Sequence, residues 1–277
     1  MHESELIENE RLEVKLLLEA IYLKYGYDFR NYAFAHTKRR LEHRKLMDGI
    51  ENYATMIHRI IYNESFFNKL LLDLSINVTE MFRDPWVYLK IRELIIPHLK
   101  TYPFIKVWHA GCSAGQEVYS MGILLEEEGI KDRSQIYATD FNEYVLSKAK
   151  MGIYPMDLIR EYTANYQKAG GRHSFSDYYT ADYDNVLMKQ SLKDKVLFSS
   201  HNLVTDGVFG EMNIIFCRNV LIYFDKDLQN RVFNLFYDSL CPGGFLCLGS
   251  KESLKFSGVA DKFEVVSERE KIYRKKR

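Results

Sequence analysis

The fold of this chain is decided by the stretch KVWHAGCSAGQEVYS, residues 106–120. A strand-like apolar run leads into a turn containing Gly111 and Gly115, and a helical pattern follows. Glycine lets the backbone approach a ligand, and the first helical turn presents unpaired N–H groups. The turn has neither the G-x-G-x-x-G spacing of dinucleotide sites nor the Lys-Ser/Thr of phosphate loops. We therefore expect a phosphate-free nucleoside such as S-adenosylmethionine, with a purely structural turn as the alternative.

Asp140 ends the next strand-like run, QIYATD, about 25 residues after the glycine turn. A carboxylate at the tip of the second strand of such a unit can accept hydrogen bonds from both ribose hydroxyls. Asp140 could also cap the helix that is expected to begin near residue 142. The two roles are compatible, so the spacing favours a nucleoside site here.

Strand-like and helical runs alternate from about residue 86 onwards. The helices are expected at 86–99, 115–128, 142–150 and 226–240, and the strands at 106–110, 135–139, 195–199, 213–216, 245–249 and 263–273. Apolar, uninterrupted strands alternating with helices predict a mostly parallel sheet that is covered on both faces. No helix of useful length separates the last two strands, so we expect an antiparallel closing pair. This α/β arrangement matches the Rossmann-like class I methyltransferase variant of the doubly wound fold.

Two other parts of the chain interrupt this alternation. Residues 1–75 carry only helical patterns, including stretches at 37–47 and 53–72, so we expect an N-terminal all-helical domain before a methyltransferase domain at 76–277. More than forty residues separate the helix at 142–150 from the strand at 195, too many for a plain connection. They predict a small inserted β-subdomain at about 170–193, a short helix followed by a hairpin, which would serve partner choice.

Composition excludes several classes of protein. The formal net charge is +0, so the whole chain has no long-range attraction to nucleic acid or to anionic membrane. The N-terminus is polar and acidic, and no apolar run approaches the roughly 18–20 residues that span a bilayer. The four cysteines form no C-x-x-C pair and no histidines cluster at zinc spacing. We expect a cytoplasmic protein without membrane insertion, disulfide framework or metal site.

Two further motifs flank the glycine turn in sequence. In NVTEMFRDP, residues 77–85, Thr79 and Arg83 are four apart, so one helical turn would place both on one side. Without other information, Arg83 would be interpreted as a surface or capping residue. In IIFCRNVLIYFD, residues 214–225, an apolar strand ends before Asn219, and ligands of open α/β sheets lie beyond such ends. Asn219 and Tyr223 are therefore candidates, although Tyr223 could equally pack as an aromatic surface.

These motifs together resemble a known family. NVTEMFRDP, AGCSAGQEVYS, ATDFNEYVLSKAKMGIYP, FSSHNL and FCRNVLIYFD occur in the order found in the CheR-type chemotaxis protein-glutamate O-methyltransferases. The resemblance covers about residues 70–255, and a compatible helical region precedes it. The chain departs from the pattern at Met81, where many members have a second Phe, and at Gln116, where many have Glu.

The resemblance implies methyl transfer from S-adenosylmethionine to glutamate side chains of chemotaxis receptors, with S-adenosylhomocysteine as the second product. It implies cofactor contacts from Asn77, Thr79, Arg83, Glu117, Asp140, Asn202, Leu203, Asn219 and Val220, to which the glycine turn adds Gly111. It also puts Arg83 and Tyr223 nearest the methyl-transfer centre.

A glutamate acceptor fits a site without a general base. The reference pKa of a glutamate carboxyl is about 4.3, so at neutral pH it is already the nucleophile. The enzyme then has to supply position, alignment and exclusion of water. We expect Arg83 to hold the incoming carboxylate or that of the cofactor, Tyr223 to orient the sulfonium, and Glu117 to take the cofactor ammonium.

Substrate recognition is expected in the helical domain. Basic residues crowd its second helix, among them Arg39, Arg40 and Arg44, and the last two share a face. The resemblance implies that they contact the acidic methylation helices of a receptor, whereas a solvated basic face is the plain alternative. The loop at 181–185 lacks the glycine of members that bind a receptor tail, which leaves tail binding in doubt. We expect a monomer, and a regulatory protein partner stays open.

Two other functions remain in competition. The first is a module that senses S-adenosylmethionine without turnover, against which the intact Arg83 and Tyr223 weigh. The second is a methyltransferase acting on nucleic acid, another protein or a small molecule. Neutral net charge and the absence of an N-P-P-Y motif weigh against nucleic acid, so no nucleic-acid partner is expected.

Overall fold

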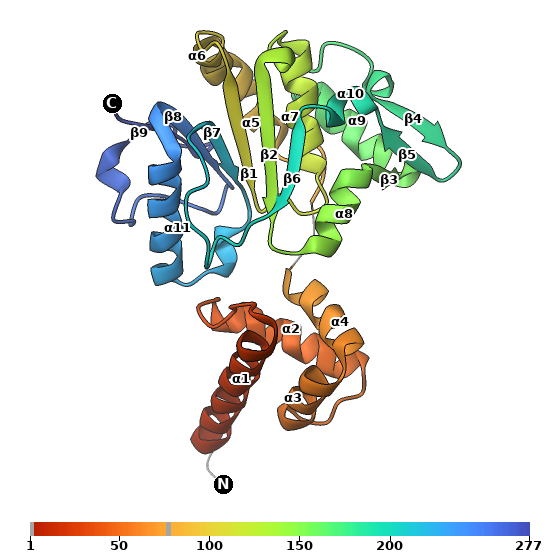
Figure 1. Cartoon of the computed structure of the whole chain (residues 1–277), viewed down its shortest axis with the longest axis vertical. Helices are drawn as coiled ribbons and strands as arrows, with labels where there is room; N and C mark the ends of the chain where they lie inside the picture. Colours follow the sequence, from red (N-terminus) through yellow and green to blue (C-terminus); the bar gives the residue numbers. More distant parts are fainter. Residues whose placement is uncertain (1–2, 76–78) are drawn as a thin grey trace. The chain divides into compact units, whose positions relative to one another are not determined.

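The computed structural model describes residues 3–75 and 79–277, and the chain divides into two compact units. The first unit contains the N-terminal helices together with Tyr223–Gln229, and the second contains the remainder. Figure 1 shows the elements of both units, coloured along the sequence. None of the helices in the described ranges is long and apolar enough to cross a membrane.

The first unit is built from four helices, α1 (Glu3–Tyr25), α2 (Phe34–Met47), α3 (Tyr53–Tyr62) and α4 (Glu64–Ser75). Its core is apolar side chains at helical spacing, buried on facing helices: Val14, Leu17, Ile21, Leu41, Met56, Ile60 and Leu70. The single helix expected at 53–72 is wrong. It is divided at Asn63, whose side chain accepts a hydrogen bond from the Phe66 N–H at 3.0 Å and so begins α4.

The second unit contains a large sheet, a small sheet and the helices around them. Its helices are α5 (Pro85–Lys90), α6 (Ile96–Leu99), α7 (Gln116–Glu127), α8 (Glu143–Met151), α9 (Ile159–Lys168), α10 (Gln190–Lys193) and most of α11 (Lys226–Ser239). One π-helical turn, Ile91–Ile95, joins α5 to α6. Short 3₁₀ turns lie at Lys131–Arg133, Met156–Leu158, Phe175–Tyr178, Leu221–Tyr223 and Ala260–Lys262.

The strands of the large sheet are β1 (Ile105–Ala110), β2 (Ser134–Asp140), β6 (Val196–Ser200), β7 (Met212–Cys217), β8 (Leu240–Leu248), β9 (Phe263–Ser267) and β10 (Ile272–Lys275). Their order is β6-β2-β1-β7-β8-β10-β9. The first five run parallel, while β10 pairs antiparallel with both β8 and β9. This order confirms the α/β class I methyltransferase fold with an antiparallel closing pair. The segment 263–273, expected as one strand, instead forms the β9–β10 hairpin.

The small sheet has the order β3-β5-β4, with β3 (Ile153–Pro155), β4 (Tyr179–Asp182) and β5 (Asn185–Met188) all antiparallel to their neighbours. The helix α9 and the hairpin β4–β5 have the expected form. The third strand, β3, comes from an earlier segment than the 170–193 insertion expected from the sequence. Figure 1 shows this sheet beside α8 and α9.

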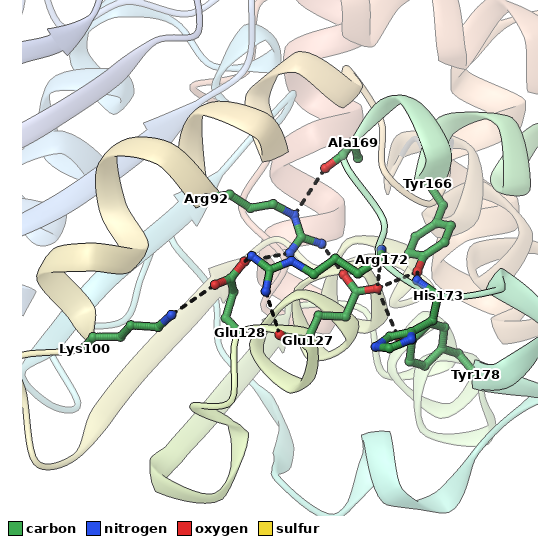
Figure 2. A network of polar contacts seen from close by, with 9 residues as sticks. All are labelled: Arg92, Lys100, Glu127, Glu128, Tyr166, Ala169, Arg172, His173 and Tyr178. Carbon is green, nitrogen blue, oxygen red and sulfur yellow. Dashed lines mark hydrogen bonds and ion pairs between the residues drawn. The ribbon is translucent and has the colours of Figure 1, made fainter.

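Two adjacent carboxylates at the end of α7, Glu127 and Glu128, fasten the inserted segment to the rest of the second unit (Figure 2). Their hydrogen-bond and ion-pair partners come from the π-turn, the loop after α6, α9 and the segment after α9: Arg92, Lys100, Tyr166, Arg172 and Tyr178. Burial alone would raise the pKa of both carboxyl groups, but these partners hold each pKa below its ordinary value. Both groups are therefore ionised and paired at neutral pH.

We predict that Glu127→Gln lowers the free energy of unfolding at pH 7 by about 3–5 kcal/mol, because Arg92 would keep a largely buried charge without one of its partners. The folded-state pKa of Glu127 lies below its unfolded value, so its stabilisation is present above about pH 4.5 and is lost as the pH falls through the lowered value. Chemical denaturation at pH 7 and pH 4 should show the difference from wild type shrinking at the lower pH.

The matched control is Glu126→Gln, one residue earlier on α7, because this side chain is exposed and pairs only with Lys131 among the residues described. Its effect should stay within about 0.5 kcal/mol. Equal effects of the two substitutions would contradict the assignment of the network.

Candidate functional site

The predicted site residues of the second unit gather at one edge of the large sheet. β1 lies between β2 and β7, and β6 flanks β2, all parallel, so the segments after these strands begin at the same edge. Gly111 follows β1, Asp140 ends β2, Asn202 follows β6 and Asn219 follows β7. The topology thus places four segments that are distant in sequence at the edge where ligands of such sheets bind.

The glycine turn requires glycine for two separate reasons. Gly111 and Gly115 have φ values of +77° and +89°, in the left-handed region. A Cβ added at Gly111 would lie 2.7 Å from Cγ2 of Val220, and one added at Gly115 would lie 2.9 Å from Cβ of Ala149. The turn therefore packs against the segment after β7 and against α8. A structural role of these glycines is thus compatible with a ligand-binding role of the turn.

Asp140 holds the same turn through its side chain. Its two oxygens accept hydrogen bonds from the N–H groups of Ser113, at 2.9 Å, and Asn142, at 3.0 Å. Burial raises the pKa of Asp140 above its ordinary value, while these N–H groups oppose the shift. The cap of α8 is Asn142, whose Oδ1 accepts from the Tyr144 N–H, and not Asp140. The Phe141 N–H is a third backbone donor to this carboxylate. A carboxylate accepts about four hydrogen bonds, so Asp140 keeps capacity for a bond from the ribose.

Arg218, for which no role was predicted, connects the segment after β7 to two other motifs. Its side chain is 2% exposed, and its guanidinium donates to Oε2 of Glu117 at 3.0 Å and to Oδ2 of Asp84 at 2.6 Å. It also donates to the backbone carbonyl of Arg83 at 3.2 Å. A charged residue that directly follows the apolar run IIFC, residues 214–217, was the signal for such a buried cation, since it needs partners there.

Glu117 is shared between this guanidinium and a buried imidazole. Its Oε1 lies 3.0 Å from Nδ1 of His109, whose ring stacks on Phe216 with centroids 4.7 Å apart. Burial would raise the pKa of Glu117, but His109 and Arg218 hold it below its ordinary value. The ionised carboxylate is thus oriented by two protein partners and retains capacity to accept a bond from an ammonium group.

The segment that carries Arg83 is held in an unusual backbone conformation. Phe82 and Asp84 have φ values of +52° and +55°, which cost of order 1–3 kcal/mol each for residues other than glycine. The Phe82 N–H donates to Oγ of Ser120 at 2.8 Å, and Asp84 is paired with Arg218. The helical turn expected to align Thr79 with Arg83 is wrong, because turns and bends occupy this segment. Such strain, held from both sides, is typical of functional sites.

The Asn202-Leu203 step lies beside Asp140. The His201 N–H donates to the backbone carbonyl of Asp140 at 3.2 Å, and the Asn202 side chain accepts from the Val204 N–H at 2.9 Å. Leu203 is buried. This turn therefore extends the ligand edge from the end of β2 to the end of β6.

Several buried polar atoms at this edge have no hydrogen-bond partner among the described residues, among them Oγ of Ser113, Oδ1 of Asn219, Nδ1 of His201 and Nε of Arg218. Buried polar atoms are nearly always satisfied, so a group of them at one edge is consistent with a polar ligand there. S-adenosylmethionine fits the set, because a carboxylate for the ribose, another carboxylate for the ammonium and glycines for close approach lie at one edge. No group of three or more His, Cys, Asp or Glu side chains in the described ranges could hold a metal ion.

Two predicted residues, Asn77 and Tyr223, are not placed relative to this edge. Asn77 lies outside the described residues. Tyr223 belongs to the first unit, where its carbonyl accepts from the Ala33 N–H at 2.8 Å and its ring meets that of His36 edge-on at 5.6 Å. A place for Tyr223 beside the methyl-transfer centre stays a prediction.

The predicted substrate-binding arginines of α2 differ from one another in their surroundings. Arg39 is exposed and Arg40 is partly buried. Arg44 donates to Asp73 at 2.6 Å and lies 3.5 Å from Asp48, with its side chain only 14% exposed. The expectation of one shared basic face is therefore corrected at Arg44, whose charge is neutralised within the helical unit.

The strand order and the glycine turn with its acidic partner define an S-adenosylmethionine-dependent methyltransferase. Comparison with known families agrees, since the CheR methyltransferase SAM binding domain matches residues 77–272 and the CheR methyltransferase all-alpha domain matches residues 12–75. The chain belongs to the CheR methyltransferase family, and S-adenosylmethionine is its cofactor.

Several curated relatives carry the same family name or activity. A protein named as a methyltransferase, Cher3 of Pseudomonas putida, is 52% identical over 267 residues, which cover 96% of this chain and 98% of that protein. The chemotaxis protein methyltransferase of Vibrio anguillarum is 36% identical over 70% of each chain. Chemotaxis protein methyltransferase 1 of Vibrio cholerae is 34% identical, also over 70% of each chain.

We predict that Gly111→Ala weakens cofactor binding as well as stability, because the new Cβ would collide with Val220 and move the segment after β7. The control is Gly129→Ala, which has a similar φ of +69° with nothing within 4 Å of the added Cβ. The control should lose only the roughly 1–2 kcal/mol of a left-handed backbone. Denaturation and calorimetric titration with S-adenosylhomocysteine measure both effects; equal losses and equal affinities in the two variants would contradict the contact.

Proposed function

We propose that this chain transfers the methyl group of S-adenosylmethionine to glutamate side chains of chemotaxis receptors, forming methyl esters. The observation that carries the proposal is the match to both family domains, the helical one and the cofactor-binding one, in a single chain. The names of the Vibrio relatives place those proteins in chemotaxis. A cytoplasmic location and a monomeric state stay predictions from the sequence.

The chemistry of the ligand edge supports a carboxylate acceptor. Bound S-adenosylmethionine supplies a methyl group carried on its sulfonium. A carboxylate oxygen can take this methyl group by in-line displacement, with S-adenosylhomocysteine leaving, and the carboxylate has no proton to lose. Glu117 is a poor base, because its pKa is held below the ordinary value by His109 and Arg218 despite its burial. An acceptor that is already ionised at neutral pH suits such a site.

The proposal assigns a role to each candidate residue. Asp140 would bind the ribose hydroxyls, and Glu117 would orient the ammonium of the cofactor. Asn202, Leu203, Asn219 and Val220 would line the remainder of the nucleoside site. Thr79, four residues before Arg83, and Asn77, which lies outside the described residues, would add further cofactor contacts. Arg83 would fix a carboxylate by paired hydrogen bonds, since its backbone is clamped by Arg218. Tyr223 would orient the sulfonium.

The helical domain supplies the contact to the receptor in this proposal. Arg39 is exposed on α2 and carries a charge suited to an acidic helix. Two apolar neighbours on the same helix, Leu46 and Met47, are 78% and 66% exposed, which gives the face an apolar part as well. Arg40 completes this surface, whereas Arg44 serves the stability of the domain.

The reaction is tested with methyl-tritiated S-adenosylmethionine and a receptor cytoplasmic fragment. We expect labelled receptor whose label is released as methanol in alkali. Arg83→Ala and Tyr223→Phe should each lower kcat/KM by roughly 100-fold, the scale of a misplaced reacting group. Arg269→Ala is the control, since that side chain is 83% exposed.

Each other outcome identifies a different function. Alkali-stable label would indicate another acceptor, and cofactor binding without label would indicate a sensing module. Near wild-type turnover in both the Arg83 and Tyr223 variants would remove these two residues from the reaction centre.

The receptor contact is tested by charge reversal on α2. Arg39→Glu should raise KM for the receptor fragment about tenfold at low salt and less at high salt, because the attraction between exposed charges is screened. Arg44→Glu should instead lower the melting temperature, because it breaks the pair with Asp73. Arg39→Lys keeps the charge and should behave like wild type. A KM for Arg39→Glu that equals wild type at low salt would exclude this residue from the contact.

A further inference from the structure

A single buried carboxylate, that of Glu252, organises the segment after β7. Its Oε2 accepts hydrogen bonds from the N–H groups of Gly249, at 2.5 Å, and Asn219, at 3.1 Å. Its Oε1 accepts from the N–H groups of Val220, at 2.9 Å, and Leu221, at 2.8 Å. Glu252 is 5% exposed, so four backbone donors satisfy a carboxylate that is almost completely removed from solvent.

The charge of Glu252 is balanced by the backbone. Within the described part of the chain Glu252 forms no ion pair. Successive backbone N–H groups that converge on one anion form a concave anion-binding site, and the N–H groups around Glu252 are arranged in this way. Burial raises the pKa of Glu252 above its ordinary value, and the four N–H groups oppose this shift. Close approach requires glycine at 249, because a Cβ there would lie 2.7 Å from the Asn219 nitrogen.

The segment bound by Glu252 has a backbone that needs such support. Asn219 has a φ of +62°, a left-handed conformation that non-glycine residues rarely adopt. Its Oδ1 is buried without a partner among the described residues, and Val220 packs where a Cβ on Gly111 would have to lie. The position of this segment therefore affects both the polar atom left for a ligand and the glycine turn.

We propose that Glu252 is a positioning residue for cofactor binding, and that its carboxylate holds residues 219–221 in the conformation that presents Asn219 and Val220 to S-adenosylmethionine. The proposal rests on the cofactor contacts of Asn219 and Val220 in the proposed function. It does not depend on the identity of the methyl acceptor.

The test is Glu252→Gln, which keeps the shape of the side chain and replaces one acceptor oxygen by an NH₂ group. Because two of the four N–H groups then lose their acceptor, the dissociation constant of S-adenosylhomocysteine should rise roughly tenfold to hundredfold in calorimetric titration. KM for S-adenosylmethionine should rise similarly, while kcat at saturating cofactor stays within about twofold. Amide hydrogen exchange at 219–221 should become faster.

The matched control is Glu128→Gln, which also removes a buried carboxylate of the second unit but lies in the network of Figure 2. It should lower the melting temperature and leave the affinity for S-adenosylhomocysteine unchanged. If Glu252→Gln behaves in the same way, with affinity within twofold of wild type, the role of Glu252 is only structural and the proposal is wrong.

Two further variants separate the remaining outcomes. If Asn219→Ala loses affinity and Glu252→Gln does not, the positioning role fails while the cofactor contact stands; if both keep wild-type affinity, the contact fails too. Glu252→Asp keeps the carboxylate on a shorter side chain and should retain more affinity than Glu252→Gln. The reverse order would overturn the proposal. If Glu252→Gln does not fold, the affinity and the amide exchange at 219–221 of Glu252→Asp test the proposal instead.

Discussion

The ligand edge depends on one buried cation, the guanidinium of Arg218. A charge that is 2% exposed is tolerated only where oppositely charged groups surround it, and here Glu117 and Asp84 do so. These partners lie on α7 and on the segment before α5, so the cation joins three parts of the chain that are far apart in sequence. Because a guanidinium is planar and its donors point in fixed directions, it also fixes the angles at which these parts meet.

Carboxylates of this edge are held in two different ways. Glu117 is oriented by side chains, whereas Asp140 and Glu252 bind backbone N–H groups of the turns beside them. These turns include left-handed residues, and regular strand or helix hydrogen bonds cannot stabilise them. The chain therefore uses its own anions to fix the loops that meet the ligand. Such preorganisation lowers the conformational-entropy cost of cofactor binding.

The elements could be predicted where a periodic pattern was long. The alternation of strands and helices gave the mostly parallel sheet, and the glycine spacing gave the turn after β1. The β9–β10 hairpin was not predicted because its turn contains no glycine or proline; Lys271 takes the left-handed position at a φ of +54°. The division at Asn63 has a similar cause, since one capping side chain interrupts an otherwise continuous apolar pattern. β3 is too short for any pattern to indicate.

The position of candidate residues at one edge of the sheet was predicted where a residue lies at or directly after a strand end, as at Gly111, Asp140 and Asn219. The role of a charged residue was not predicted where its ion-pair partner is distant in sequence. Arg218 pairs with Glu117 across 101 positions, and Arg44 pairs with Asp73 across 29. Spacing along one helix gives the direction of a side chain but not what faces it, so Arg44 had the same predicted role as Arg40. A charged residue can therefore be assigned to substrate contact only after the residues that form internal ion pairs have been set aside. On α2 this leaves Arg39 as the exposed arginine and Arg40 as a partly buried one.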